Sequence, residues 1–90
     1  MEIEFDQAKR DETLAERGLD FLDAPRLFEG TFLTVNDTRF DYGEERWRTY
    51  GWIGDVAIAA VWTLRGDRRR IISMRRMHDE EVAEVGLDRP

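Results

Sequence analysis

The sequence predicts an α+β domain, with two N-terminal helices packed on one face of an antiparallel β-meander sheet and a short C-terminal helix. Residues 46–76 carry the sheet signal, because three strand-like runs are separated by the two-residue turns Gly54-Asp55 and Gly66-Asp67, which are typical of β-hairpins. Residues 6–30 and 78–86 instead show the apolar spacing and terminal glycines of helices. Helices that are segregated in sequence from a meander normally cover one face of it.

Composition limits the chain to a single domain over residues 1–90, with a frayed tail at residues 87–90. The 90 residues are 41% hydrophobic and 11% aromatic, which suffices for one core. The absence of cysteine excludes a disulfide framework and a thiolate metal site. The first residues lack the apolar region of a secretory signal, and the longest apolar run, residues 56–62, is too short to cross a bilayer. We therefore expect a cytoplasmic protein without membrane contact.

The N-terminal segment predicts a short edge strand followed by a capped helix. Ile3 and Phe5 alternate with glutamates, as on a strand with one buried face. Asp6 is suited to N-cap a helix that runs to about Arg17, and Gly18 is suited to close it in the left-handed conformation. The apolar stripe of this helix is thin, so one face is left for solvent or a partner.

A second helix is expected to start at Asp20 and to end at Gly30. Its core face comprises Phe21, Ala24, Leu27 and Phe28. Residues 31–36 are rich in β-forming side chains and predict a strand, and residues 36–44 predict a polar loop that leads into the meander.

If both turns are two-residue loops, the register of the meander follows from the sequence. Trp47 then opposes Trp62, Trp62 opposes Ile71, and Ala60 opposes Ser73. Opposed residues share a face, so one face becomes the apolar core. It carries Trp47, Ile53, Val56, Ile58, Trp62 and Ile71. The opposite, open face carries Arg46, Arg48, Tyr50, Trp52, Val61, Thr63, Arg70, Ile72, Met74 and Arg76.

Positive charge concentrates on the meander, although the protein has a formal net charge of −6. Residues 46–76 hold eight arginines against two aspartates, whereas the segments on either side are acidic. Arginines interleaved with Tyr50 and Trp52 suit RNA, because guanidinium groups bind phosphate and aromatic rings stack on bases. Alternatively, the arginines solubilise the sheet and pair with the acidic helices, which is the interpretation that the pattern alone favours.

The sequence offers few groups for catalysis. His78 is the only histidine, and the acids that follow it fit the first turn of a helix better than a metal site, so we expect no metal and no cofactor. Metal-free RNA cleavage needs less, because the 2′-hydroxyl attacks the adjacent phosphate while the protein orients the strand and neutralises the developing charge. Convergent arginines would supply that charge, and Glu45 or Tyr42 could transfer the proton.

Taken in order, several motifs resemble the BrnT family, the ribonuclease toxins of BrnT/BrnA type II toxin–antitoxin systems. They are F-D-x-A-K at Phe5–Lys9, G-L-D-F-x-x-A at Gly18–Ala24, D-Y-G-E-E-R at Asp41–Arg46, T-x-R-G-D at Thr63–Asp67, and R-I-I-S-x-R-R at Arg70–Arg76. The resemblance covers about residues 5–76, and the last motif is fairly specific when it follows T-x-R-G.

The resemblance implies a fold similar to that of RelE toxins and a metal-independent ribonuclease activity that inhibits translation. It also implies neutralisation by a BrnA-like antitoxin, whose ribbon-helix-helix part binds operator DNA. Given this resemblance, the interpretation of the meander arginines as a functional site becomes the favoured one.

Three departures from the family pattern concern the chemistry. Arg17 stands where the N-x-x-K-H-G motif of the family usually has histidine, and arginine holds phosphate but does not transfer protons near pH 7. Met74 occupies the usual place of a small residue, and the C-terminal helix is acidic where family members are typically basic. RNA binding is therefore better supported by the sequence than RNA cleavage.

The candidate site residues follow from the motifs and from the open face. We expect the catalytic contacts to be Arg17, Glu45, Arg46, Arg65, Arg70 and Arg75, and the RNA-binding contacts to be Lys9, Arg48, Tyr50 and Arg76. The predicted register points Arg75 to the core face, which conflicts with a site role unless Arg75 lies at the end of the sheet or the register shifts. The alternative function is a non-catalytic, degenerate member of the family that binds a protein partner, such as an acidic segment, through its basic sheet face.

Overall fold

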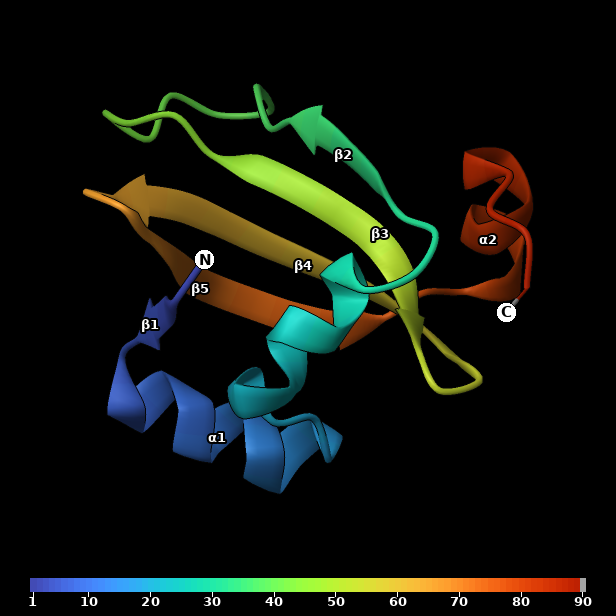
Figure 1. Ribbon diagram of the computed structural model, residues 1–90, viewed down its shortest axis with the longest axis horizontal. Coiled ribbons are helices and arrows are strands. Elements are labelled where there is room, and N and C mark those ends of the chain that lie inside the picture. The colour runs from blue at the N-terminus through green and yellow to red at the C-terminus, as the bar shows by residue number, and fades with distance from the viewer. Residues whose placement is uncertain (90) are drawn as a thin grey trace.

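The computed structural model describes residues 1–89, which form a five-stranded mixed sheet and three helices (Figure 1). The strands are β1 (Ile3–Phe5), β2 (Leu33–Asn36), β3 (Trp47–Ile53), β4 (Val56–Arg65) and β5 (Arg68–Arg76), and the helices are α1 (Gln7–Arg17), η1 (Phe21–Phe28) and α2 (Asp79–Val85). The strand order in the sheet is β1-β5-β4-β3-β2. From β2 to β5 each strand is antiparallel to the next, but β1 is parallel to β5. The α+β class is confirmed, and the prediction of a wholly antiparallel sheet is wrong at β1.

The cap residues set both ends of α1 as the sequence predicts. The Asp6 carboxylate accepts a hydrogen bond from the backbone N–H of Lys9 at 3.0 Å, and Gly18 closes the helix with a φ of 67°. The second helix, η1, is a 3-10 helix that ends at Phe28 rather than at Gly30. Pro25 lies inside η1 and has no N–H to donate, which removes one α-helical hydrogen bond.

The core lies between η1 and one face of the sheet. It is built from Leu19, Phe21, Ala24, Leu27, Ile58, Ala60, Trp62, Ile71 and Met74. Gly51 allows η1 to approach β3 closely, because a Cβ at this position would lie 3.2 Å from the carbonyl oxygen of Leu27. Trp47, Ile53 and Phe28 are partly buried against this core, whereas Val56, which was expected in it, is exposed beside the β3–β4 turn.

The predicted register holds across β3 and β4 but fails in the second half of β5. Trp47 opposes Trp62, and Trp62 opposes Ile71, as the two-residue turns require. Beyond this point a β-bulge shifts the pairing by one residue, so that Ala60 opposes Met74 instead of Ser73. A bulge places two residues of one strand against one of its partner, and here it reverses the facing of every later residue in β5.

The bulge exchanges the faces of the last four residues of β5, from Ser73 to Arg76. Met74 is 0% exposed and belongs to the core, although the sequence placed it on the open face. Arg75 opposes Ala59 and lies on the open face, whereas Arg76 opposes Ile58 on the core side. The shift resolves the conflict over Arg75, because this residue now faces the same side as Arg48 and Tyr50.

The helices cover both faces of the sheet. The core face is covered by η1, and α1 lies beside it against β5 (Figure 1). In contrast, α2 packs over one end of the open face, in a second cluster formed by Tyr50, Ala59, Met77, Val35, Ala57, Val82, Val85 and Leu87. Leu87, the first residue of the tail predicted to fray, packs in this cluster, and Pro90, its last residue, lies outside the described residues. None of the helices formed by residues 1–89 is both long and apolar enough to cross a membrane.

Candidate functional site

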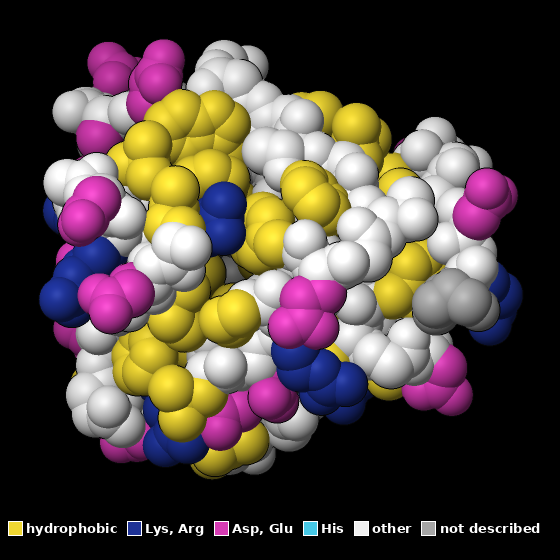
Figure 2. Space-filling model, viewed as in Figure 1, with side chains coloured by type: hydrophobic (Ala, Val, Ile, Leu, Met, Phe, Trp, Pro, Cys, Tyr) yellow, Lys and Arg dark blue, Asp and Glu magenta, His cyan; other side chains and the backbone are white. Residues whose placement is uncertain are grey.

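A groove of about 240 Å³ opens on the open face of the sheet. It is lined by Arg17, Arg39, Arg48, Tyr50, Ala59, Ala60, Val61, Ser73 and Arg75. We call it the arginine groove, because its four arginines come from four segments: the end of α1, the loop after β2, strand β3 and strand β5. Figure 2 views the molecule from the side of η1, where apolar side chains gather and basic ones are scattered. A concave surface lined by one sign of charge attracts counter-ions.

Arg17 reaches the groove from the end of α1. Strand β1 pairs with β5 only from Arg69 to Ile71, and beyond Ile71 the end of α1 lies beside β5 instead. There Arg17 Nη1 donates a hydrogen bond to the carbonyl oxygen of Met74 at 2.8 Å, and Arg76 Nη1 donates to the carbonyl oxygen of Arg17. These two bonds fix the C-terminus of α1 against the edge of the sheet.

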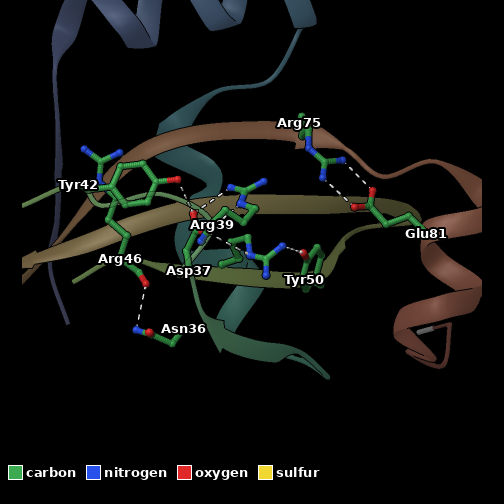
Figure 3. Close-up of polar contacts among 9 residues, drawn as sticks. Asn36, Asp37, Arg39, Tyr42, Arg46, Tyr50, Arg75 and Glu81 are labelled. Atoms are coloured by element: carbon green, nitrogen blue, oxygen red, sulfur yellow. Dashed lines mark hydrogen bonds and ion pairs between the residues drawn. The ribbon is translucent and has the colours of Figure 1, made fainter. Parts of the chain in front are cut away.

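A buried carboxylate, Asp37, lies between two of the arginines (Figure 3). Its side chain is 0% exposed and accepts hydrogen bonds from Arg39 Nε at 2.8 Å, Arg39 Nη2 at 2.9 Å and the Tyr42 hydroxyl at 3.2 Å. Arg48 Nε lies 3.7 Å from Asp37 Oδ1. The hydrogen bonds from Arg39 are the largest cause that lowers the pKa of Asp37 to about 2.

Tyr50 lines the groove, although the residue is largely buried. The residue is only 7% exposed, because its ring packs with Ala59 and Met77 in the second apolar cluster. Arg48 Nη1 donates a hydrogen bond to the Tyr50 hydroxyl at 3.0 Å. The sequence suggested that Tyr50 stacks on a base, but its buried ring leaves no face for stacking in this arrangement.

Arg75 is held by the acidic first turn of α2. Its Nη1 and Nη2 atoms donate to the two carboxylate oxygens of Glu81, each at 2.7 Å (Figure 3). Bidentate pairs of this kind are among the stronger side-chain interactions. The hydrogen bonds from Arg75 lower the pKa of Glu81, and the same bonds raise the pKa of Arg75. Arg39, a second cation, lines the same groove as Arg75.

Other predicted site residues gather at the far end of the open face, outside the groove lining. The guanidinium of Arg65 binds Glu44 through two hydrogen bonds of 3.2 Å, which are the main cause that lowers the pKa of Glu44. Arg46 lies 4.1 Å over the ring of Tyr42. The backbone oxygen of Glu45 accepts a bond of 2.6 Å from the Thr63 hydroxyl, and the Glu45 side chain is exposed.

The remaining predicted residues are also separate from the groove lining. Arg70 binds Glu4 of β1 at 2.7 Å, and Lys9 is exposed in the first turn of α1. Arg76 turns to the core side of β5 because of the bulge. From the predicted set the fold therefore brings together Arg17, Arg48, Tyr50 and Arg75.

Sequence reasoning missed three residues of this region: Arg39, Ser73 and the buried Asp37. Arg39 and Asp37 lie in a polar loop, and only their two-residue spacing could have indicated an ion pair. Ser73 was assigned to the core face because the bulge was not anticipated.

Together these groups can bind and neutralise a multiply charged anion. Guanidinium groups match phosphate oxygens in geometry and charge, and four of them would converge on one anion in the groove. Only two side chains that line the groove, Tyr50 and Ser73, carry hydroxyl groups. The site is thus rich in charge stabilisation and poor in proton carriers.

Comparison with known proteins gives one family. The family model described as "Ribonuclease toxin, BrnT, of type II toxin-antitoxin system" matches residues 5–81, and it confirms the resemblance seen in the motifs. No curated protein matches the chain.

Proposed function

The chain belongs to the BrnT family of ribonuclease toxins of type II toxin–antitoxin systems, and we propose that it binds and cleaves RNA in the arginine groove. One observation carries the assignment of the site: Arg17, Arg39, Arg48 and Arg75 converge there from four separate segments. RNA presents closely spaced phosphates, and the family match supports RNA as the target.

In this proposal the cleavage step needs no metal ion. The 2′-hydroxyl of the substrate gives up its proton to solvent water as it attacks the adjacent phosphorus, the bond to the 5′-oxygen breaks, and negative charge builds up on the non-bridging oxygens of the transition state. Arginines already held in place stabilise this charge without reorganising. The Tyr50 hydroxyl, which lies beside Arg48, is the best placed group to pass a proton to the leaving oxygen. Glu45, the proton-transfer group expected from the sequence, lies at the other end of the open face.

Family membership supports further proposals about the biological role. A type II toxin has an antitoxin partner, and we propose a BrnA-like antitoxin whose ribbon-helix-helix part brings the complex to operator DNA. RNA cleavage would inhibit translation in the cytoplasm. The fold would be related to that of RelE toxins, in which helices pack against a sheet.

A second function is favoured by one feature of the groove. Carboxylates already occupy its arginines, since Glu81 binds Arg75 and Asp37 binds Arg39. An acidic segment of a partner protein would find the same donors. The chain would then be a degenerate toxin that binds its partner without cutting RNA.

Cleavage of RNA by the purified protein distinguishes the two functions. We expect the wild-type protein to cleave single-stranded RNA in the presence of EDTA, and Arg48→Ala and Arg75→Ala to lower the rate by about 100-fold each. Arg68→Ala is the matched control, because Arg68 lies on β5 but pairs with Glu2 outside the groove. A wild-type protein that binds an antitoxin but cleaves no RNA would establish the degenerate module instead. Equal loss in all three variants would show that the groove is not the site.

A further inference from the structure

We infer that Asp37 is a positioning residue for RNA cleavage, whose buried carboxylate fixes the guanidinium groups of Arg39 and Arg48 in the arginine groove. The inference rests on the proposed function, since it assumes that these arginines bind the substrate. Asp37 itself does not line the groove, so any effect on the reaction must pass through its neighbours.

The backbone places this carboxylate firmly. Asp37 directly follows β2, and its N–H donates to the carbonyl oxygen of Arg46 at 2.7 Å. The Asn36 side chain donates to the same oxygen at 3.3 Å (Figure 3). Asp37 is thus anchored at the start of the loop that carries Arg39, beside Arg46, where the loop returns to β3.

The burial of Asp37 requires that its charge be compensated. A fully buried carboxylate is costly unless it is paired and hydrogen-bonded, and Asp37 meets this condition through Arg39 and the hydroxyl of Tyr42. Its low pKa, about 2, keeps it ionised throughout the physiological range. The carboxylate is therefore a constant negative charge rather than a titrating one.

The hydrogen bonds to Asp37 leave Arg39 Nη1 available for a ligand, whereas the Arg48 nitrogen nearest to Asp37 is itself buried. Arg39 uses Nε and Nη2 for Asp37, so its Nη1 takes no part in the pair. Arg48 Nε lies 3.7 Å from Asp37 Oδ1, which is longer than a hydrogen bond, and this nitrogen is buried without a hydrogen-bond partner among residues 1–89. The carboxylate attracts both cations, which would otherwise repel each other, and so holds them on the same side of the sheet.

Prearranged charges stabilise a transition state only while their positions are kept. A displacement of about 1 Å at a catalytic group can cost roughly 100-fold in rate. Arg39 lies on a loop and is about half exposed, so its pair with Asp37 is the main restraint on its position. Loss of that restraint should lower the rate of cleavage more than it lowers the affinity for RNA.

A mutant cycle on kcat and KM tests the inference with a short single-stranded RNA. Asp37→Asn should lower kcat by roughly 10- to 100-fold, with a smaller change in KM. In an Arg39→Ala background, the same change should cost clearly less than it does in the wild-type protein, because only Arg48 is then left for Asp37 to position. Asp41→Asn is the control, since this exposed carboxylate of the same loop accepts a hydrogen bond from the backbone N–H of Gly43 and forms no other side-chain hydrogen bond among residues 1–89.

The outcomes separate the inference from the function on which it rests. The positioning role would be overturned if Asp37→Asn cleaved RNA with the kcat of the wild-type protein. It would also be overturned if the fold losses in kcat of Asp37→Asn and Arg39→Ala multiplied in full in the double variant. Wild-type cleavage by both Arg39→Ala and Arg48→Ala would instead overturn the proposed site. Should Asp37→Asn fail to fold, Asp37→Glu decides, because it keeps the charge and moves the carboxylate by one methylene. Normal cleavage by folded Asp37→Glu would reject the inference, and a loss of kcat would support it.

Discussion

Arg75 and Glu81 form a bidentate ion pair that ties α2 to the arginine groove, with both nitrogen–oxygen distances at 2.7 Å. The pair has two consequences. It fixes the acidic helix over one end of the open face, together with the apolar contacts of Val82 and Val85. It also fills two donors of Arg75 that a phosphate group would use, so Glu81 competes with RNA for this arginine.

Removal of this competitor should strengthen RNA binding. We expect Glu81→Gln to lower the Kd for single-stranded RNA by roughly 3- to 10-fold at low salt, because one charge-assisted pair no longer has to be broken. Fluorescence anisotropy with a labelled oligonucleotide measures the effect. Glu84→Gln is the control, because it removes the same charge from an exposed position of α2. If Glu81→Gln binds RNA no better than Glu84→Gln does, then Glu81 does not compete at the site.

Acid should destabilise the protein, and Asp37 should account for part of the loss. Its pKa is lowered from 3.8 to about 2 in the folded state, so its stabilising contribution is present above pH 4 and is lost as the pH falls towards 2. The difference between the two pKa values corresponds to about 2 kcal/mol. Urea denaturation at pH 3 and pH 6 measures the loss, which should be smaller by about 1 kcal/mol in Asp37→Asn, because about half of the contribution of Asp37 is still present at pH 3. An identical loss in both proteins would contradict the assigned pKa.

The bulge in β5 makes a further prediction about Met74. In the observed register this side chain is 0% exposed in the core, so Met74→Ala should lower the free energy of unfolding by about 2–5 kcal/mol. In the register without a bulge, Met74 would lie on the open face, and the same substitution would cost little. Urea denaturation distinguishes the two registers. Leu22→Ala, at an apolar residue of η1 that is 57% exposed, gives the reference for a surface site.

Signals that are local in sequence predicted most of the fold. Asp6 and Gly18 set the ends of α1 through hydrogen bonds within one helical turn. The glycines at Gly54 and Gly66 have positive φ values of 61° and set the two hairpins. These features depend on neighbouring residues only, which is why they could be predicted from the sequence.

Features that depend on distant parts of the chain were not predicted. The parallel pairing of β1 with β5 cannot be read from three residues of β1, because the alternation of side chains is the same in either direction. The bulge at Ile72 allows Met74 to pack in the core, and no residue near Ile72 in the sequence indicates a bulge. The same shift reverses the faces expected for Ser73 and Arg75. One unanticipated bulge residue, Ile72, therefore accounts for much of the difference between the expected and the observed lining of the groove.

Arg17 allows the chemistry of the groove to be tested directly. The family motif usually has histidine at this position, and Arg17 lines the groove beside β5. A histidine there would add a group that transfers protons near neutral pH, which the present lining lacks. We expect Arg17→His to raise kcat and to give it a pH dependence with an inflection near about 6.5.

The comparison that decides this prediction is with Arg17→Gln, which also shortens the side chain and removes the charge but cannot titrate. Both variants lose the bond to the carbonyl oxygen of Met74, so a structural effect of that loss would appear equally in each. If kcat of Arg17→His exceeds that of Arg17→Gln and only the histidine variant shows the inflection, the groove is a cleavage site limited by proton transfer. If the two variants have the same kcat at every pH from 5 to 8, the groove holds RNA at a point remote from the reacting bond.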